Sequence, residues 1–564
     1  VGLRRLHLGT GESEPPRLNV YAVGIEVEGG SPVAERRWVG RDCDTGTPVE
    51  FASNGANYGP GVFDMNDDGD PEVLMGSMVF DHEGCLLNTP EDDDIGDPDV
   101  YVVHGPMHTV ADLDADGVVE LVAGHRIASW NDTTSEWEEP DWFERDDDVH
   151  ETGHVAVADI GQYSELPGHP LPNSLPEIIV VSAESFDAGT DSTGTIRAQA
   201  LDGSVIFGPL DLYFDPDRHP YGGKGGAPTA SDFDGDGQVE FAAAGGDFYT
   251  VYDPDCDADP DTSPPEREGG TCERSDAMAG LPEGILWAQP SQDRSSNATG
   301  SSVFDFNGDG RAEAVYSDEC FTRVYDGRSG EVIFSGSGSS GTGYELPVIA
   351  DVDGDFATEI AVARTERSAC PDFDPIFGDG DESSFDDSDG LVVLRDPEDR
   401  WAGSRAIWNQ HAYSVTHVTD DGQVVRTRDW EQNWTVEGLN NFRQNVQGDL
   451  GLLNIADLTV VFHDLEELCS TTLPAELPLR ARVCNRGTDR VADGVAVEFA
   501  EGEDVVCETS TTRLLEPGEC EEVECSGTVS STEDLVVRVD PDDEVADCRP
   551  GNDEGVAASS LCIF

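Results

Sequence analysis

The chain has 564 residues, which is long enough for two or more domains. It carries 117 acidic residues against 32 basic ones, a net charge of −85, and its one lysine is Lys224. Nucleic acid and anionic membrane surfaces both attract positive charge, so we expect neither as a partner. No apolar run approaches the roughly 18 residues of a membrane span, so we expect no direct membrane insertion.

A nine-residue pattern of oxygen-bearing side chains recurs five times. Positions 1, 3, 5 and 9 of the pattern are Asp, Asp or Asn, Asp, and Glu. The copies are Asp64, Asn66, Asp68 and Glu72; Asp112, Asp114, Asp116 and Glu120; Asp232, Asp234, Asp236 and Glu240; Asp305, Asn307, Asp309 and Glu313; and Asp351, Asp353, Asp355 and Glu359.

This spacing is typical of a turn wrapped around a hard cation. Ca²⁺ takes six to eight oxygen ligands, and alternating carboxylates on a tight turn supply them. Four copies have Gly at position 6, where a positive φ suits the wrap, whereas the fifth has Phe356 and is expected to be weaker. We therefore predict about five Ca²⁺ ions, which would cancel about 10 of the surplus negative charges.

The flanks of each copy predict strands rather than the helices of an EF-hand. Short apolar runs such as Val62-Phe63 and Val73-Met75 precede and follow the pattern, and the Glu is at position 9 instead of 12. A degenerate copy runs from Asp159 to Glu177 without the middle ligands. We expect this copy to bind no metal.

The spacing of the copies predicts the fold class. First aspartates lie about 47 residues apart, or about 73 where a loop is enlarged. A repeat of that length with about four strands is one blade of a β-propeller. Hairpin patterns recur at 322–334 and 196–207, and residues 20–38 form an outer hairpin that we expect to close the ring against a last blade near 406–425. We predict an all-β protein with six recognisable blades and one composite blade, a seven-bladed β-propeller.

These turns resemble the FG-GAP repeats of integrin α chains and of many secreted bacterial proteins. The resemblance covers roughly residues 19–450, and we assign residues 1–450 to this domain. It implies that positions 1, 3, 5 and 9 hold Ca²⁺, together with a backbone carbonyl at position 7.

Residues 401–448 are rich in Trp, Asn and Gln. We interpret them as the last blade followed by a packed strap. The functional alternative is a sugar-binding surface of aromatic and amide side chains.

Residues 456–564 predict an Ig-like β-sandwich. About seven short strands occur in about 105 residues, including 457–462, 479–483, 495–499 and 535–539. The segments Arg482–Gly487, Leu515–Gly518 and Val539–Asn552 resemble the cell-adhesion-related domain of bacteria.

Thirteen cysteines indicate an oxidising, extracellular compartment. We expect Cys256 to pair with Cys272, Cys43 with Cys85, and Cys320 with Cys370. Seven cysteines follow residue 460, and the odd total leaves one thiol free or bridging to another chain.

Three strings look catalytic and are set aside. His150-Glu151-Thr152-Gly153-His154 matches the zinc-peptidase motif, but that chemistry needs a helix, and a strand-like run follows. Neither the glycine-rich run at 336–341 nor that at 222–226 opens a nucleotide-binding helix. We predict no catalytic residue.

Two classes of function fit the pattern. The first is a secreted, non-enzymatic structural or adhesion protein that assembles into a homopolymer such as a filament or tubule, with glycans or cell-surface proteins as further partners. The second is a carbohydrate-active protein, either a lectin or a polysaccharide lyase on a propeller scaffold. A glycan array with a lyase assay would separate the two classes.

Overall fold

The computed structural model describes most of the chain, and every statement below concerns these residues. They are 2–6, 17–28, 31–49, 51–52, 60–88, 107–146, 150–161, 163–164, 166, 175–182, 193–216, 222–256, 270–293, 297, 299–340, 346–354, 357–365, 370, 390–396, 401–420, 422–446, 456, 458–462, 473–486, 490–502, 504–515, 519–531, 535–541, 545 and 553–556. They form strands and five 3-10 helices of three residues each, which confirms the all-β class. None of the described helices is long and apolar enough to cross a membrane.

Six antiparallel sheets follow one another along the chain, and in each the strands are paired in chain order. The first is β5 (Gly61–Phe63), β6 (Glu72–Met75) and β7 (Met78–Phe80). The second is β8 (Thr109–Ala111), β9 (Glu120–Val122), β10 (Ile127–Asn131) and β11 (Glu136–Glu138). The third is β12 (Gly153–Ala158), β13 (Glu177–Ser182), β14 (Thr195–Gln199) and β15 (Val205–Asp211).

The remaining three sheets repeat this plan. The fourth is β16 (Thr229–Ser231), β17 (Glu240–Ala244), β18 (Phe248–Tyr252) and β19 (Ile285–Pro290), with helices η1 (Pro254–Cys256) and η2 (Asp276–Met278) before β19. The fifth is β20 (Ser301–Phe304), β21 (Glu313–Ser317), β22 (Phe321–Tyr325) and β23 (Val332–Ser337). The sixth is β24 (Val348–Ala350), β25 (Glu359–Arg364) and β26 (Gly390–Leu394).

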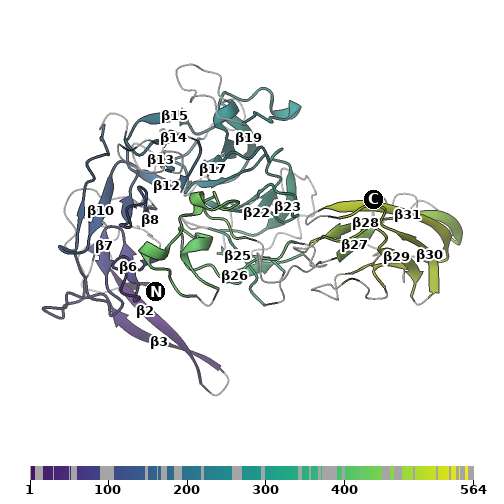
Figure 1. Ribbon diagram of the computed structural model, residues 1–564, viewed down its shortest axis with the longest axis horizontal. Helices are drawn as coiled ribbons and strands as arrows, with labels where there is room; N and C mark the ends of the chain where they lie inside the picture. Colours follow the sequence, from purple (N-terminus) through teal and green to yellow (C-terminus); the bar gives the residue numbers. More distant parts are fainter. Residues whose placement is uncertain are drawn as a thin grey trace.

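The sheets are arranged around an arc (Figure 1). The first strands of successive sheets lie beside one another, β12 with β16, β16 with β20 and β20 with β24. The hydrophobic core lies between neighbouring sheets, because strands buried on both faces present apolar side chains to each neighbour. Ile179 of β13, for example, belongs to the same buried cluster as Phe241 of β17.

The N-terminal sheet does not close the ring in the expected way. It contains β1 (Gly2–Leu6), β2 (Arg17–Glu28), β3 (Ser31–Val39) and β4 (Phe51–Ala52). The hairpin expected at 20–38 is confirmed, since β2 and β3 pair in antiparallel register. Val20 packs with Val73 and Phe80 of the first sheet, however, and no described strand joins it to residues 406–425.

The expected last blade near 406–425 was wrong. The described residues between 401 and 446, which we call the central segment, contain only isolated bridges and three helices, η3 (Val415–His417), η4 (Thr427–Asp429) and η5 (Asn433–Thr435). Figure 1 draws this segment in green near the middle of the arc. Amide side chains can both donate and accept hydrogen bonds, so this composition suits pairing with backbone N–H and carbonyl groups that no neighbouring strand pairs with.

The central segment hydrogen-bonds to the first strands of several sheets, so the expected packed strap is confirmed. Asn440 bonds to both the N–H (3.0 Å) and the carbonyl of Asp159. Phe442 donates its N–H to Ala230 in β16 at 2.8 Å. The Arg443 side chain, 1% exposed, donates to the carbonyl of Ser301 in β20.

Residues 456–556 form a two-sheet sandwich, as expected for an Ig-like domain. One sheet pairs β27 (Leu458–Phe462), β28 (Ala475–Asn485) and β31 (Cys520–Val529). The other pairs β30 (Asp504–Ser510), β29 (Ala496–Glu501), β32 (Leu535–Val539) and β33 (Glu554–Val556). Alternate residues of both sheets, such as Leu479 and Val497, fill the core between them.

Five disulfides cross-link the described residues. The expected pairs Cys43–Cys85, Cys256–Cys272 and Cys320–Cys370 are confirmed, and Cys484–Cys520 and Cys507–Cys525 lie in the sandwich. The other three cysteines, Cys469, Cys548 and Cys562, lie outside the described residues.

We expect that removing one buried amide of the central segment, that of Asn445, destabilises the protein. Asn445 is fully buried, and its side-chain amide donates to the carbonyls of Ile349 (2.8 Å) and Arg405 (3.0 Å). We expect Asn445→Ala to lower stability by about 1–3 kcal/mol, because both carbonyls lose their donor. The midpoint of urea unfolding, followed by tryptophan fluorescence at a fixed Ca²⁺ concentration, measures this loss of stability. The exposed Glu437→Ala in the same segment is the control, and equal midpoints for the two variants would contradict a linking role.

Candidate metal-binding turns

Each repeat of the acidic pattern joins the first strand of a sheet to its second strand. The Glu at position 9 is the first residue of the second strand in every sheet, and it pairs across the ladder with the residue that precedes the Asp at position 1. The pairs are Phe63 with Glu72, Ala111 with Glu120, Ser231 with Glu240, Phe304 with Glu313 and Ala350 with Glu359. The strand–turn–strand setting inferred from the flanking runs is therefore confirmed.

The backbone of the turns is left-handed at two positions. At position 6, Gly69, Gly117, Gly237 and Gly310 have φ between 86° and 95°. Position 4 is also left-handed, with Asp67 and Ala115 at φ 61° and 56°. The sequence interpretation missed position 4, although Gly occupies it in the other three copies.

A shared set of hydrogen bonds orients the carboxylates. In all five turns the Glu at position 9 accepts the N–H of position 2 through Oε2 at 2.8–2.9 Å. In the four turns with Gly at position 6, that N–H donates to Oδ2 of the Asp at position 1 at 2.8–3.1 Å. These bonds fix the orientation of both carboxylates, and the second oxygen of several of them also accepts a hydrogen bond, as Asp232 Oδ1 does from the N–H of Gly235.

Three turns bring three carboxylates together, with one oxygen of each within 4.8 Å of the others. These groups are Asp112, Asp114 and Glu120; Asp232, Asp234 and Glu240; and Asp351, Asp353 and Glu359. In the turns with Asn at position 3, the amides of Asn66 and Asn307 donate to the Glu at position 9 at 2.9–3.0 Å. Three turns therefore bring positions 1, 3 and 9 together, and the two turns with Asn bring at least positions 3 and 9 together.

Three buried oxygens in these turns fit a hard cation. Asp64 Oδ1, Asp234 Oδ2 and Asn307 Oδ1 make no hydrogen bond to any described residue. A buried oxygen without a partner costs free energy, and a bound Ca²⁺ would satisfy it. The side chains at positions 1, 3 and 9 could therefore hold a hard cation such as Ca²⁺, whose charge would offset their repulsion. The Asp at position 5 accepts the N–H of position 7 in four turns, and its part in binding a cation stays a prediction.

Burial and mutual repulsion raise the pKa of several of these carboxyl groups. Burial, reinforced by Asp68 and Asp64, raises the pKa of Glu72 to about 7. Burial, reinforced by Asp305 and Asp309, raises the pKa of Glu313 to about 9. A site that penalises ionised carboxylates without a counter-charge favours a bound cation.

The fifth turn is described only in part. Asp351, Asp353 and Glu359 lie together as predicted. Asp355 and Phe356 lie outside the described residues, so the expected effect of losing the glycine stays a prediction.

The degenerate turn has the same frame without the middle ligands. Glu177 begins β13 and accepts the N–H of Ile160 through Oε2 at 3.0 Å, as the other glutamates do. Its Oε1 instead accepts the N–H of Ser164 at 2.9 Å. The positions that hold an acidic or amide side chain in the other turns are Gly161 and Tyr163 here, so this turn offers fewer oxygen ligands. The expectation that it binds no metal stays a prediction.

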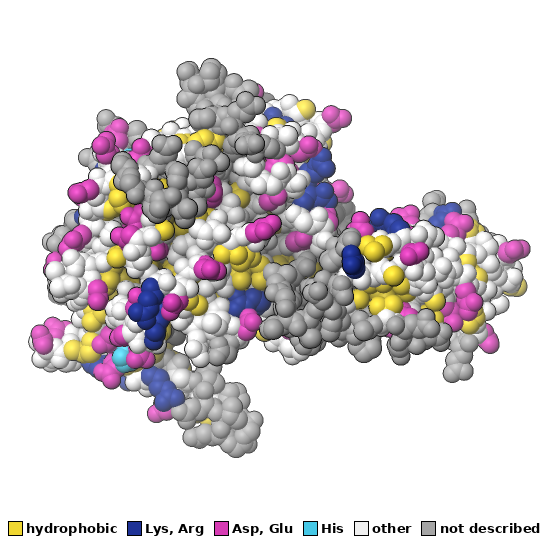
Figure 2. Space-filling view, viewed as in Figure 1, with side chains coloured by type: hydrophobic (Ala, Val, Ile, Leu, Met, Phe, Trp, Pro, Cys, Tyr) yellow, Lys and Arg dark blue, Asp and Glu magenta, His cyan; other side chains and the backbone are white. Residues whose placement is uncertain are grey.

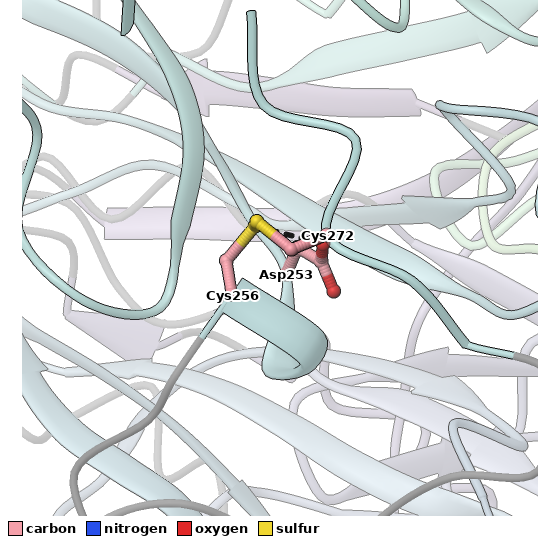
Figure 3. Close-up of side chains that lie close together, drawn as sticks. All are labelled: Asp253, Cys256 and Cys272. Carbon is pink, nitrogen blue, oxygen red and sulfur yellow. Dashed lines mark hydrogen bonds between the residues drawn. A yellow bond between two sulfur atoms is a disulfide. The ribbon is translucent and has the colours of Figure 1, made fainter. Parts of the chain in front are cut away.

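Two other groups resemble metal sites by composition. Asp253, Cys256 and Cys272 lie together, but Figure 3 shows the two sulfurs joined as a disulfide, so neither can act as a thiolate ligand. In the zinc-peptidase-like string, His154 lies on strand β12 and accepts the N–H of Met107, whereas His150 bonds to Gly203. These histidines do not share a helix face.

The aromatic residues of the central segment pack among other side chains. Trp408 stacks on Tyr413 with ring centroids 4.5 Å apart, and Arg443 lies over its ring. Trp430 contacts Phe63 and donates to Thr416. This packing favours a structural role over the sugar-binding alternative for these rings.

Acidic side chains are scattered over the visible surface of both the sheet arc and the sandwich (Figure 2). Lys and Arg side chains are fewer on that face, in line with 32 basic residues against 117 acidic ones.

Comparison with known proteins supports the C-terminal assignment. The family CARDB matches residues 455–556, which agrees with the expected cell-adhesion-related, Ig-like sandwich. No curated protein sequence matches the chain.

Three solved structures are similar at low identity. The biofilm matrix protein Bap1 of Vibrio cholerae is 15% identical over 79% of this chain and 95% of that chain, with a TM-score of 0.42. A CARDB domain from Pyrococcus furiosus is 18% identical over 18% of this chain and 92% of its own, with a TM-score of 0.15. The calcium-binding protein regucalcin of Agrobacterium tumefaciens is 13% identical over 55% of this chain and 83% of its own, with a TM-score of 0.28. At these TM-scores we draw nothing from them about this chain.

The raised pKa values predict how pH affects the chelated protein. A carboxyl with a raised folded-state pKa makes the folded state bind more protons than the unfolded state, so its contribution to stability falls as pH rises toward that pKa. In EDTA we expect the melting temperature to fall between pH 7 and 8.5, where Glu72 and Glu313, with pKa values of about 7 and 9, still titrate. In excess Ca²⁺ this decline should disappear, because the ion holds the carboxylates ionised. Parallel pH profiles in EDTA and Ca²⁺ would contradict the prediction.

The degenerate turn provides a matched control for metal binding. We expect Asp305→Ala to reduce the rise in melting temperature that Ca²⁺ causes, because position 1 supplies a ligand. Asp159→Ala changes the equivalent residue of the metal-free turn and should leave the Ca²⁺-induced rise unchanged. Thermal scans of both variants with and without Ca²⁺ measure the difference. Equal Ca²⁺ responses in the two variants would refute the assignment.

Proposed function

We propose that this chain is a secreted, calcium-binding structural or adhesion protein. The observation that carries the proposal is the repeated turn, in which the same Glu, the same hydrogen bond to it from position 2 and the same strand register recur in five sheets. Ca²⁺ in these turns would stiffen the ends of the first strands. No catalytic role is proposed for any residue.

We propose further that the sheets are the blades of an FG-GAP-like β-propeller. The neighbouring first strands and the chain order of each sheet support this arrangement. With the N-terminal sheet counted as a blade, the number is seven, although the composite blade expected from the sequence is not part of it. The proposed domains are 1–450 and 456–564.

An extracellular location is part of the proposal. Five disulfides among the described residues favour an oxidising environment, and Ca²⁺ sites fill readily where calcium is millimolar. The CARDB match at residues 455–556 supports an adhesive role.

We propose that the chain assembles with itself into a filament or tubule. At −85 per chain, copies repel each other, so cations must bridge or neutralise the surfaces in contact. A contact between two different surfaces that does not close into a ring propagates as a filament. Glycans and cell-surface proteins are the further partners that such a polymer could hold.

One open surface pocket supports the alternative that this chain binds glycans. It lies between the turns at 232–240 and 305–313, and its lining residues include Asp234, Glu273, Arg311 and Arg328. Two adjacent Ca²⁺ turns with arginines nearby would suit hydroxyl and carboxylate groups of an acidic saccharide. A glycan array in Ca²⁺, with a lyase assay on the bound glycans, tests this alternative.

Light scattering and electron microscopy test the proposed assembly. In millimolar Ca²⁺ we expect large particles with a regular filament or tube form, and excess EDTA should dissolve them within the same sample. A protein that stays monomeric at high concentration in Ca²⁺ would refute self-assembly and leave a soluble binding module.

A further inference from the structure

The first of the five turns is covered by part of the central segment. An isolated parallel bridge joins Asp64, at position 1, to Arg426. Thr427 donates its N–H and its hydroxyl to the carbonyl of Asp64, at 3.2 and 2.8 Å. Arg428 donates its N–H to the Asp67 carboxylate at 3.1 Å. The central segment is therefore held on this turn by hydrogen bonds that do not involve the Arg426 side chain.

These contacts place the Arg426 guanidinium against positions 1 and 6 of the turn. Its Nε lies 3.9 Å from Oδ2 of Asp64, whose side chain is 1% exposed. A Cβ atom added at Gly69, at position 6, would lie 3.0 Å from its Nη2. The Arg426 side chain is itself 42% exposed, so it can turn into solvent while the backbone of the central segment stays in place.

The other turns with Gly at position 6 have no described side chain packed there. A Cβ atom added at Gly117, Gly237 or Gly310 would meet no described atom within 4 Å. Arg311 pairs with Asp309, but at position 5 of the fourth turn. An arginine packed against position 6 therefore distinguishes the first turn from these three.

A guanidinium beside these carboxylates has two opposite effects. Without a bound ion, its positive charge offsets part of their mutual repulsion. With a bound Ca²⁺, it lies close to a double positive charge and repels it. A single and a double positive charge about 6 Å apart in water-like surroundings repel each other enough to weaken binding about tenfold.

We propose that Arg426 is a tethered counter-ion of the first turn and lowers the affinity of this turn for Ca²⁺ about tenfold. When Ca²⁺ fills the turn, the Arg426 side chain moves toward solvent, and the hydrogen bonds of Thr427 and Arg428 keep the backbone in place. The central segment thus sets the calcium concentration at which the first turn fills. This inference rests on the proposed binding of Ca²⁺ and names a residue that sets the affinity of one site.

Arg426→Gln tests this role, and Arg428→Gln is the matched control. Both substitutions remove one positive charge from the same segment, but the Arg428 side chain lies beside Asp429, 3.8 Å away, which belongs to no turn. Ca²⁺ is titrated into each EDTA-treated and desalted protein in competition with a chelating dye. We expect one dissociation constant to fall about tenfold in Arg426→Gln and none to change in Arg428→Gln. In an Asp64→Ala background, Arg426→Gln should change no dissociation constant.

Melting temperatures separate this role from simple packing. In EDTA we expect Arg426→Gln to melt below the wild type, because the carboxylates of the first turn lose their counter-ion. In excess Ca²⁺ the difference should vanish or reverse. A loss of equal size in both conditions would mean that Arg426 only packs against the turn, and the proposal would be wrong.

The titrations also separate this proposal from the calcium binding on which it rests. If the wild type binds Ca²⁺ and the two variants give the same dissociation constants, the role of Arg426 is overturned while calcium binding stands. If the wild type binds no Ca²⁺, both are overturned.

Discussion

The repulsion between carboxylates held in the strand-to-strand turns governs this structure. Each Glu at position 9 begins a buried strand and is at most 2% exposed, so it cannot move into solvent without breaking the ladder. Hydrogen bonds fix the orientation of that Glu and of the Asp at position 1, and in three turns one oxygen each of positions 1, 3 and 9 lies within 4.8 Å of the others. Like charges in such a geometry either take up protons or bind a cation. Near neutral pH, in water that contains calcium, we propose that a bound cation relieves the repulsion.

The central segment adds a second constraint. It spans the first strands of several sheets and also touches the turns, since Thr427 donates to the carbonyl of Asp64 and Arg426 lies 3.9 Å from its carboxylate. Residues more than 350 positions apart in the chain therefore hold the same turn. A substitution in the first turn is expected to change the packing of the central segment, because the two are joined by hydrogen bonds.

Local features could be predicted from the sequence, and long-range ones could not. The turns were predictable because their acidic residues lie within nine positions of one another, and three disulfides because each bracketed an insert or joined neighbouring repeats. The sandwich strands followed from alternating apolar residues. The central segment was mistaken in part for a blade because its polar side chains bond to distant strands and have no periodicity of their own. The packing of the N-terminal sheet on β6 and β7 likewise depends on contacts such as Val20 with Phe80, which no local pattern encodes. The left-handed residue at position 4 was visible in the sequence as a recurring glycine and was overlooked.

Calcium content measures the central claim most directly. The protein is dialysed first against EDTA and then against millimolar Ca²⁺, passed over a desalting column, and analysed for bound metal by elemental analysis together with its protein concentration. The repeated turns predict about five calcium ions per chain after the second dialysis and none after the first. A chain that retains no calcium and melts at the same temperature in EDTA and in Ca²⁺ would contradict the account.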